Sequence, residues 1–253
     1  MKNVKPLGKY KRLFSVIMLI GFGVIVVNCA PPPSQLQPTL PPNFSYKPPS
    51  TATKALDLTI GIVNPQYETQ FGGDEAQSLK NLYSTSMGTD FERIIIAKGF
   101  KTTGPFPSQN EMTYPEKERA SLILVPEIAI DIKTTVTRKI RPGGLFLPGS
   151  IDGYYSCNGY ISLYLIEPLS GEKMWIKRID IAPSQREFHT TISQDINGGL
   201  HTKSNSSQVI QRLLEQSYQE VMTKAWDYLD PTEISNLMPQ VDEVRKKAVF
   251  HNN

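Results

Sequence analysis

Hydrophobic and polar residues alternate in several stretches of the chain, and each stretch predicts a β-strand. In the longest of them the even positions from Ile128 onward are apolar and most odd positions are polar, which indicates one buried and one solvated face. Pro126 in the same stretch indicates a sheet edge, a bulge or a break. The last two stretches are joined by the turn sequence at 168–171, which predicts a hairpin. The predicted strands are Leu56–Val63, Ser121–Val136, Tyr160–Glu167 and Lys173–Ile181.

Two other stretches have apolar residues at helical spacing. The first runs from Asp74, a good capping residue, to about Lys98, and Gly99 supplies the usual stop. The second is Gln208–Leu229, which follows a polar loop that reaches to Ser207. Asp230-Pro231-Thr232-Glu233 then begins a further helix, which Pro239 limits or kinks.

The order of these elements is strand, helix, a run of strands and then helices. It predicts an α+β fold with two layers, in which helices pack on one face of an antiparallel sheet. Residues 56–253 are long enough for one such domain, and the sequence shows no internal repeat.

The N-terminal segment has the pattern of an export signal. A basic stretch without acidic residues leads into the apolar run Leu13–Val27, which is short for a membrane-spanning helix. The run ends at Asn28-Cys29, which resembles the cleavage site of bacterial lipoproteins, although a small residue is usual where Asn28 stands. We therefore expect residues 1–28 to be a signal peptide and Cys29 to carry lipid; an uncleaved N-terminal anchor is the alternative.

Removal of that signal changes the charge of the protein. Without the five basic residues of 1–28, 22 basic residues face 24 acidic ones, a net charge of −2 in place of +3. A slightly acidic protein has no general attraction for nucleic acid, so we expect no nucleic-acid partner. Lipid on Cys29 would leave Cys157 without a disulfide partner, and its place before an apolar strand indicates a buried, inert thiol.

Residues 29–55 contain eight prolines and hardly a charge. Proline fixes φ and removes a backbone donor, so this segment favours an extended stalk between the lipid and the domain. A disordered leader would have the same composition.

The sequence contains none of the common catalytic motifs. It has three histidines, none at a spacing suited to a metal or a nucleophile, so we expect neither an enzyme nor a metal or other cofactor. The feature with more chemical content is basic. Lys133, Arg138, Lys139 and Arg141 fall within nine residues and are candidate contacts for an acidic ligand, because an arginine fork can hold a carboxylate through two hydrogen bonds. A solvated strand face is the alternative.

The alternation of this strand places Lys133, Lys139 and Arg141 on its solvent face. It places Arg138 on the apolar face, which suggests that the strand ends or twists near that residue.

The hairpin sequence Leu165-Ile166-Glu167-Pro168-Leu169-Ser170-Gly171-Glu172 resembles that of the neuraminyllactose-binding hemagglutinin family, the flagellar sheath adhesins of Helicobacter. Arg141-Pro142-Gly143-Gly144-Leu145 before it and Gly198-Gly199-Leu200 after it fit the same pattern, so the chain resembles a divergent relative. The proposed sialic-acid motif of the family is Lys-Arg-Thr-Ile-Gln-Lys. The corresponding segment here is 133–138, where Lys133 and Thr135 match and Thr134 replaces the arginine.

The resemblance implies a lipoprotein of the outer membrane or flagellar sheath that is anchored by its lipid and binds sialylated host glycans. A structural lipoprotein of the envelope or flagellar sheath, with protein partners and no glycan ligand, is the alternative. The proline-rich segment lies outside the family pattern.

Overall fold

The structure is a computed structural model that describes residues 41–68, 71, 74–143, 148–195 and 199–251 of the 253-residue chain. The compact unit begins at Pro41. The predicted signal peptide and Cys29 lie outside the described residues.

One mixed sheet forms the first layer of this unit. The strand order is β3-β1-β4-β5-β6-β7, and β2 pairs with β4. β1 is parallel to β3 and β4, and β2 is parallel to β4, whereas β4, β5, β6 and β7 form antiparallel pairs. The strands are β1 (Thr59–Val63), β2 (Gln66–Tyr67), β3 (Lys101–Phe106), β4 (Leu122–Ile140), β5 (Gly149–Ile166), β6 (Lys173–Gln194) and β7 (Leu200–Ser204).

The α+β class is confirmed. The sheet is antiparallel from β4 to β7, as predicted, and is mixed as a whole because β1, β2 and β3 add parallel pairs. β1 and β3 are parallel because a helix crosses between them, as parallel neighbours require. β3 and the short β7 were not predicted, and β7 occupies part of the expected polar loop before Ser207. The predicted hairpin is present, with strands that reach far beyond the expected ends.

Helices form the second layer. They are α2 (Asp74–Ala97), the 3₁₀ turn η1 (Gln109–Glu111), α3 (Tyr114–Arg119), α4 (Ser206–Tyr228), α5 (Pro231–Ser235) and α6 (Met238–His251). α2 and α4 match the predicted helices, and the carboxylate of Asp230 caps α5 by accepting from the amides of Thr232 and Glu233. Instead of kinking that helix, Pro239 lies in the first turn of the separate α6. None of the described helices is long and apolar enough to cross a membrane.

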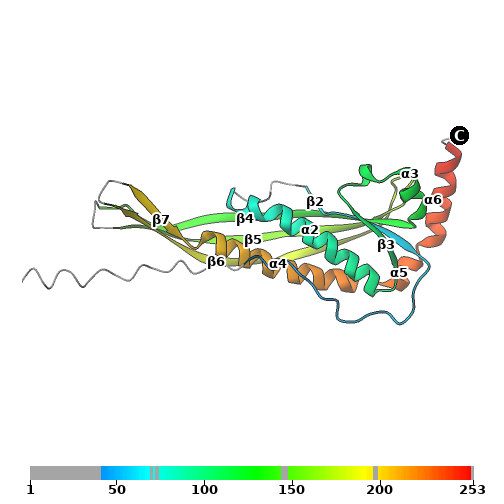
Figure 1. The fold of residues 1–253 in the computed structure, drawn as a ribbon, viewed down its shortest axis with the longest axis horizontal. Coiled ribbons are helices and arrows are strands. Elements are labelled where there is room, and N and C mark those ends of the chain that lie inside the picture. The colour runs from blue at the N-terminus through cyan, green and yellow to red at the C-terminus, as the bar shows by residue number, and fades with distance from the viewer. Residues whose placement is uncertain (1–40, 69–70, 72–73, 144–147, 196–198, 252–253) are drawn as a thin grey trace, which may run out of the picture. The chain divides into compact units, whose positions relative to one another are not determined.

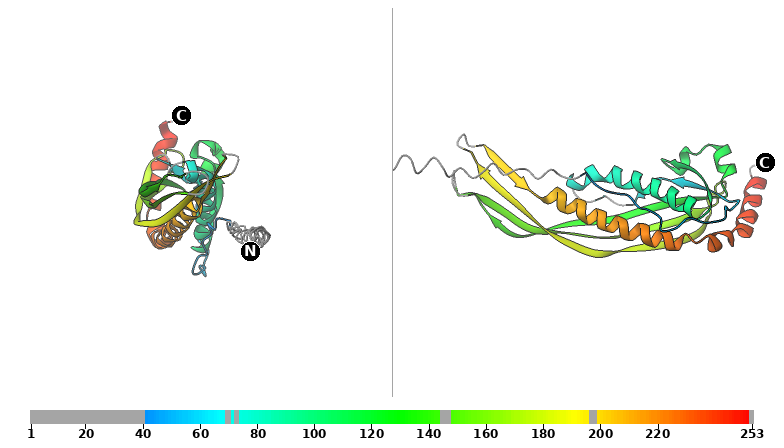
Figure 2. Two further views of the ribbon diagram at one scale, coloured as in Figure 1. Left: turned by 90° about the vertical axis from the view of Figure 1, so that its left-hand side faces the viewer. Right: turned by 60° about the horizontal axis from the view of Figure 1, so that its bottom comes forward.

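α2 and α4 lie side by side on one face of the sheet, here called the helix side (Figure 2). The main core fills the space between them and the sheet, with Tyr83 and Phe91 from α2, Tyr218 from α4 and Leu163 from β5 all fully buried. Cys157 belongs to this core, and its burial raises the pKa of its thiol to about 12. The predicted burial of this thiol is thereby confirmed. The opposite face, here called the outer face, carries a smaller cluster around Ile123 and Met112.

Residues 41–56, here called the strap, pack on the helices instead of forming the end of a free stalk (Figure 1). Phe44 is buried against the rings of Tyr83 and Tyr218. The backbone amide of Tyr46 donates to the buried carboxylate of Asp90 at 2.6 Å. The domain therefore begins near Pro41 and not at Leu56, because two aromatic residues within the proline-rich segment insert into the core.

The sheet continues past the N-terminal ends of α2 and α4 as an extension of four strands (Figures 1 and 2). We call this extension the arm. It consists of the far ends of β4 and β5, the far end of β6, and β7. Residues 133–140 of β4 are all exposed, because no helix covers them. The arm comprises residues 133–141, 149–154, 187–195 and 200–204.

Candidate functional site

A β-bulge in the arm decides where the predicted basic residues point. Val136 pairs with Gly153 and Arg138 pairs with Asp152, so Thr137 is an extra residue on β4. One extra residue exchanges the two faces of every later position in a strand. Arg138 therefore lies on the outer face together with its partner Asp152, and Lys139, which pairs with Ile151, lies on the helix side.

The structure separates the four predicted residues. Lys133 lies on the outer face, where its ammonium contacts the carboxylate of Asp131 at 2.9 Å, and this hydrogen bond raises the pKa of the lysine. Arg138 shares that face, and Arg141 follows the end of β4. The prediction that Lys133 and Lys139 share one face is wrong, because the bulge between them reverses the alternation.

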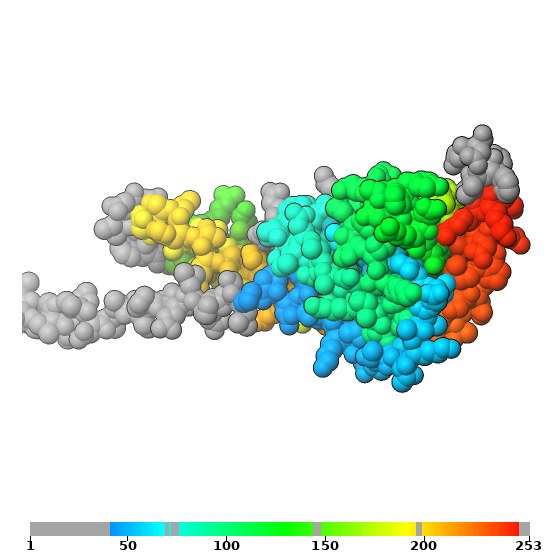
Figure 3. Space-filling view, turned by 45° about the vertical axis from the view of Figure 1, so that its right-hand side comes forward, coloured from blue at the N-terminus to red at the C-terminus, as the bar shows by residue number. Residues whose placement is uncertain are grey.

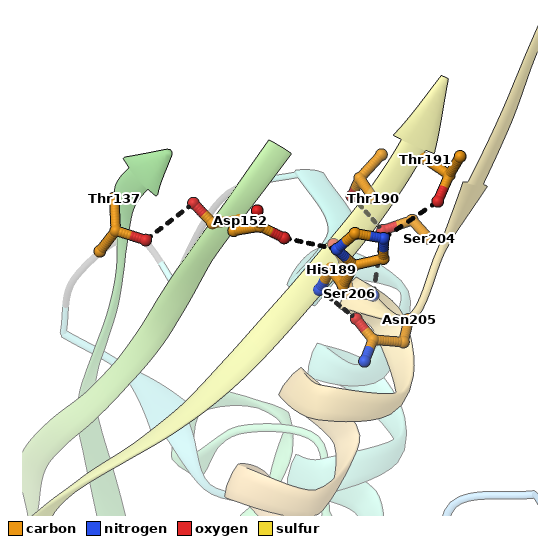
Figure 4. A network of polar contacts seen from close by, with 8 residues as sticks. All are labelled: Thr137, Asp152, His189, Thr190, Thr191, Ser204, Asn205 and Ser206. Carbon is orange, nitrogen blue, oxygen red and sulfur yellow. Dashed lines mark hydrogen bonds and ion pairs between the residues drawn. The ribbon is translucent and has the colours of Figure 1, made fainter. Parts of the chain in front are cut away.

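A polar network surrounds Asp152, the pairing partner of Arg138 (Figure 4). The imidazole Nδ1 of His189 contacts the carboxylate of Asp152, and its Nε2 lies 3.0 Å from the hydroxyl of Thr191. The hydroxyl of Thr137, the bulge residue, donates to the backbone carbonyl of Asp152 at 3.2 Å. The bulge and the His189–Asp152 pair thus form one continuous hydrogen-bonded surface across β4, β5 and β6.

The start of α4 holds this surface in place. The side-chain oxygen of Asn205 accepts from the backbone amide of His189 at 2.8 Å. The backbone amide of Asn205 in turn donates to the backbone carbonyl of His189. Below it, the hydroxyl of Ser204 lies 2.7 Å from those of Thr190 and Ser206. Asn205 makes no side-chain cap on α4, because its side-chain oxygen accepts from the backbone of β6 instead.

These residues surround a depression of about 500 Å³. Its wall offers the carboxylates of Asp152 and Glu187, an imidazole, a hydroxyl and an amide for hydrogen bonds, and the ring of Tyr154 for stacking. Polar groups beside an aromatic ring suit a sugar. Arg138 is not a lining residue, but it pairs with the lining residue Asp152, and its guanidinium suits a carboxylate. The lining residues are Thr137, Asp152, Gly153, Tyr154, Glu187, Phe188, His189 and Asn205.

Asp152, His189 and Thr191 have the order of groups found in hydrolase triads, but their surroundings do not favour catalysis. The His189 side chain is 58% exposed, whereas electrostatic stabilisation of a transition state requires a site that excludes water. The three residues are also cross-strand and second-neighbour positions on one sheet face, where such contacts follow from register alone. Among the described residues, no group of three potential ligands is placed to hold a metal ion.

Sequence reasoning missed His189, Asp152 and Asn205. The pairing of the hairpin near its turn would place Asp152 opposite Phe188. A second bulge, in which β6 has two residues (182 and 183) opposite Asn158, moves the partner of Asp152 to His189. A polar residue at each alternate position of 150–156 and 185–191 was the available signal, and it required both strands to be extended far from the turn.

The hairpin motif at 165–172 has a structural role. Glu167 is fully buried, and one carboxylate oxygen accepts from the amides of Leu169 and Ser170 at 2.9 and 2.6 Å. The other oxygen binds Nε of Arg245 on α6 at 2.9 Å. Gly171 takes a positive φ of 75°, which favours glycine. The motif therefore fixes the turn and joins it to the C-terminal helix at the end of the sheet away from the arm.

Comparison with known proteins places these features in context. The sequence profile of a family described as "neuraminyllactose-binding hemagglutinin precursor" matches residues 35–248. No curated protein matches the chain.

Among solved structures, a putative neuraminyllactose-binding hemagglutinin homolog from Helicobacter pylori is similar in fold. It is 17% identical, with a TM-score of 0.59, and the match covers 81% of this chain and 100% of that chain. A protein of Xanthomonas campestris matches with 8% identity and a TM-score of 0.37, over 76% of this chain and 93% of its own. A minor lipoprotein of Acinetobacter baumannii matches with 7% identity and a TM-score of 0.25, over 67% of this chain and 93% of its own.

Proposed function

Because the chain belongs to the neuraminyllactose-binding hemagglutinin family, we propose that it is a lipid-anchored surface protein that binds sialylated glycans. The ligand would bind to the outer face of the arm. The family name supports the ligand class, and the position of Arg138 supports the site.

The bulge at Thr137 is the observation that carries this proposal. It moves Arg138 to the face that bears the depression, next to Asp152 and His189. Sialic acid combines a carboxylate with several hydroxyl groups. The guanidinium of Arg138 would hold the carboxylate, and Asp152, His189 and Asn205 would exchange hydrogen bonds with the hydroxyls. Thr134, which replaces the arginine of the family motif, pairs with Tyr155 and so lies on the helix side, so Arg138 supplies the charge on the outer face.

The anchor is the second part of the proposal. Two acyl chains attached through Cys29 would hold the protein stably in the outer membrane. Pro41, where the compact unit begins, is twelve positions after Cys29. At about 3.1 Å per residue in an extended proline-rich chain, the tether reaches roughly 37 Å at most.

A glycan array probed with the full lipoprotein in detergent tests the ligand. We expect signal on sialylated glycans and its loss on the same glycans after sialidase treatment. Equal signal before and after sialidase, or none on any sialoside, would refute sialic-acid recognition. Intact mass of the purified protein tests the anchor separately.

A structural role in the envelope or flagellar sheath is the second candidate, and one feature favours it. The outer edge of β4 from Ala129 to Ile140 pairs with no strand in the described parts of the chain. Such an edge can accept a strand from another protein. Crosslinking in native membranes tests this role with a benzophenone residue at Thr135. Capture of an envelope protein supports the role. Equal capture of the same protein by a benzophenone residue at exposed Ile176 argues against it.

A further inference from the structure

The strap shows from which end of the unit the N-terminal tether leaves. Its contacts follow the helices in order: the amide of Asn43 binds Glu215, the carbonyl of Ser45 accepts from Gln219, and the amide of Ala52 binds the carbonyl of Ala97. Traced back towards Pro41, the strap therefore runs towards the N-terminal end of α4, where the arm begins. In Figures 1 and 3 the darkest blue residues accordingly lie on the side where the unit narrows to the arm.

The helix side of the arm carries two exposed apolar side chains, among polar ones such as Thr134 and Thr202, and none of the described residues covers it. Val136, on β4, pairs with Gly153 and is 52% exposed; Leu200, on β7, pairs with Gln194 and is 67% exposed. The register of β4 to β7 places both side chains on the same face as buried Phe188. This face continues the core surface beyond the point where α4 begins and stops covering the sheet.

The arm also differs in charge from the rest of the protein. It contains five basic residues and three acidic ones, a net charge of +2. Lys133, Arg138 and Lys203 lie on the outer face, and Lys139 lies on the helix side. The mature chain from Cys29 has 22 basic and 24 acidic residues, so 17 basic and 21 acidic residues remain outside the arm, a net charge of −4. The charged residues of the arm are Lys133, Arg138, Lys139, Arg141, Lys203, Asp152, Glu187 and Asp195.

From these three observations we infer that the helix side of the arm rests on the anionic lipid surface of the membrane that anchors the protein. The inference depends on the proposed lipid at Cys29, because the tether restricts the unit to within about 37 Å of the bilayer. Val136 and Leu200 would enter the headgroup region, and Lys139 on the same face would approach lipid phosphates. Pro41, where the described chain begins, and the uncovered face lie towards the same end of the unit, so one orientation satisfies both.

This orientation leaves the outer face of the arm accessible. Arg138 and the depression at His189 would then point away from the bilayer, because they lie on the opposite side of the same strands. A protein tethered in this way would present the polar network to solvent while Val136 and Leu200 are covered by lipid.

Fluorescence of the full lipoprotein in vesicles tests the contact. The probe is an environment-sensitive dye on Leu200→Cys, with the same dye on Ile176→Cys as the matched control, since Ile176 is 57% exposed on β6 outside the arm. Native Cys157 is buried and Cys29 is blocked if it carries lipid, so neither competes for the dye. The vesicles contain phosphatidylethanolamine with or without phosphatidylglycerol, and lipids with a quencher in the upper acyl chain report contact.

We expect quenching at residue 200 and little at residue 176, and the effect at residue 200 should require phosphatidylglycerol. Lys139→Glu should lower the ratio of docked to free arm by at least about fivefold, since each basic residue near an anionic surface is worth about that factor. Equal quenching at the two positions, or none at residue 200, would overturn the inference. Flotation of the same vesicles shows whether the protein is anchored, and the glycan array shows whether it binds sugar. A missing anchor or a missing sugar site can therefore be distinguished from a missing contact between the arm and the lipid.

Discussion

Arg138 pairs with Asp152 because Thr137 is an extra residue of β4 that has no partner on β5. Without that bulge, Arg138 would pair with Ile151 and point to the helix side, away from His189. The chemical character of the outer face therefore depends on one extra residue. A sequence in which Thr134 replaces the family arginine therefore still carries an arginine on the same face as Asp152.

The strap is part of the folded unit, so its removal should destabilise the protein. Phe44 is 7% exposed and packs on Tyr83 and Tyr218. Phe44→Ala should lower the free energy of unfolding by about 3 kcal/mol, as expected for a buried aromatic residue replaced by alanine. Urea unfolding measures the change, and Lys47→Ala, an exposed neighbour in the strap, is the control. Identical stability of the two variants would show that the strap is not packed as described.

The Glu167–Arg245 pair should contribute strongly to stability. Glu167 is fully buried, so Arg245→Ala leaves a buried carboxylate with only the amide donors of its own turn. The loss should be about 3 kcal/mol, near the lower end for a broken buried pair. Asp57→Ala removes the exposed ion pair with Lys101 and should leave the urea midpoint unchanged. A midpoint for Arg245→Ala equal to that of the wild type would contradict the role assigned to the hairpin motif.

Cys157 should be unreactive in the folded protein. Burial raises the pKa of its thiol to about 12, whereas an unfolded cysteine ionises near about 8.5. The contribution of this thiol to stability is therefore complete below about pH 8.5 and is lost as the pH rises towards 12. At pH 8, an aromatic disulfide reagent should react only as fast as the protein opens, and rapidly in urea. Rapid reaction without denaturant would place the thiol at the surface.

Labelling with a palmitate analogue tests the anchor at the residue level. Cys29→Ala should lose the label, and Cys157→Ala should keep it, because the second thiol is buried in the core. Retention of the label in Cys29→Ala would assign the lipid to another residue. An intact mass that includes residue 1 and no fatty acid would instead support the uncleaved anchor.

The sequence predicted those elements whose pattern reflects one buried face. α2, α4 and the strands near the hairpin turn are of this kind, since their apolar residues face a single core. The arm was predicted poorly for the opposite reason. Residues 133–140 are exposed on both faces, so no burial pattern reports their register, and each bulge moves the partners by one position. Prolines suggested a stalk at 41–55, and the burial of Phe44 and Tyr46 outweighed that local preference.

The candidate site could be predicted only in part. The basic segment on β4 was evident from sequence, but which of its residues share a face was not, because the answer lies in the bulge. Asp152 and His189 are 37 positions apart and meet only through the long pairing of β5 and β6.

Calorimetric titration of the full lipoprotein with sialyllactose tests the central claim most directly. Arg138 and Lys139 are adjacent in sequence and lie on opposite faces of β4, so they form a matched pair. Arg138→Ala should weaken binding at least about tenfold, as expected for a lost charge-assisted hydrogen bond, while Lys139→Ala should bind like the wild type. Equal weakening by the two substitutions, or unchanged binding in Arg138→Ala, would contradict a sugar site on the outer face of the arm.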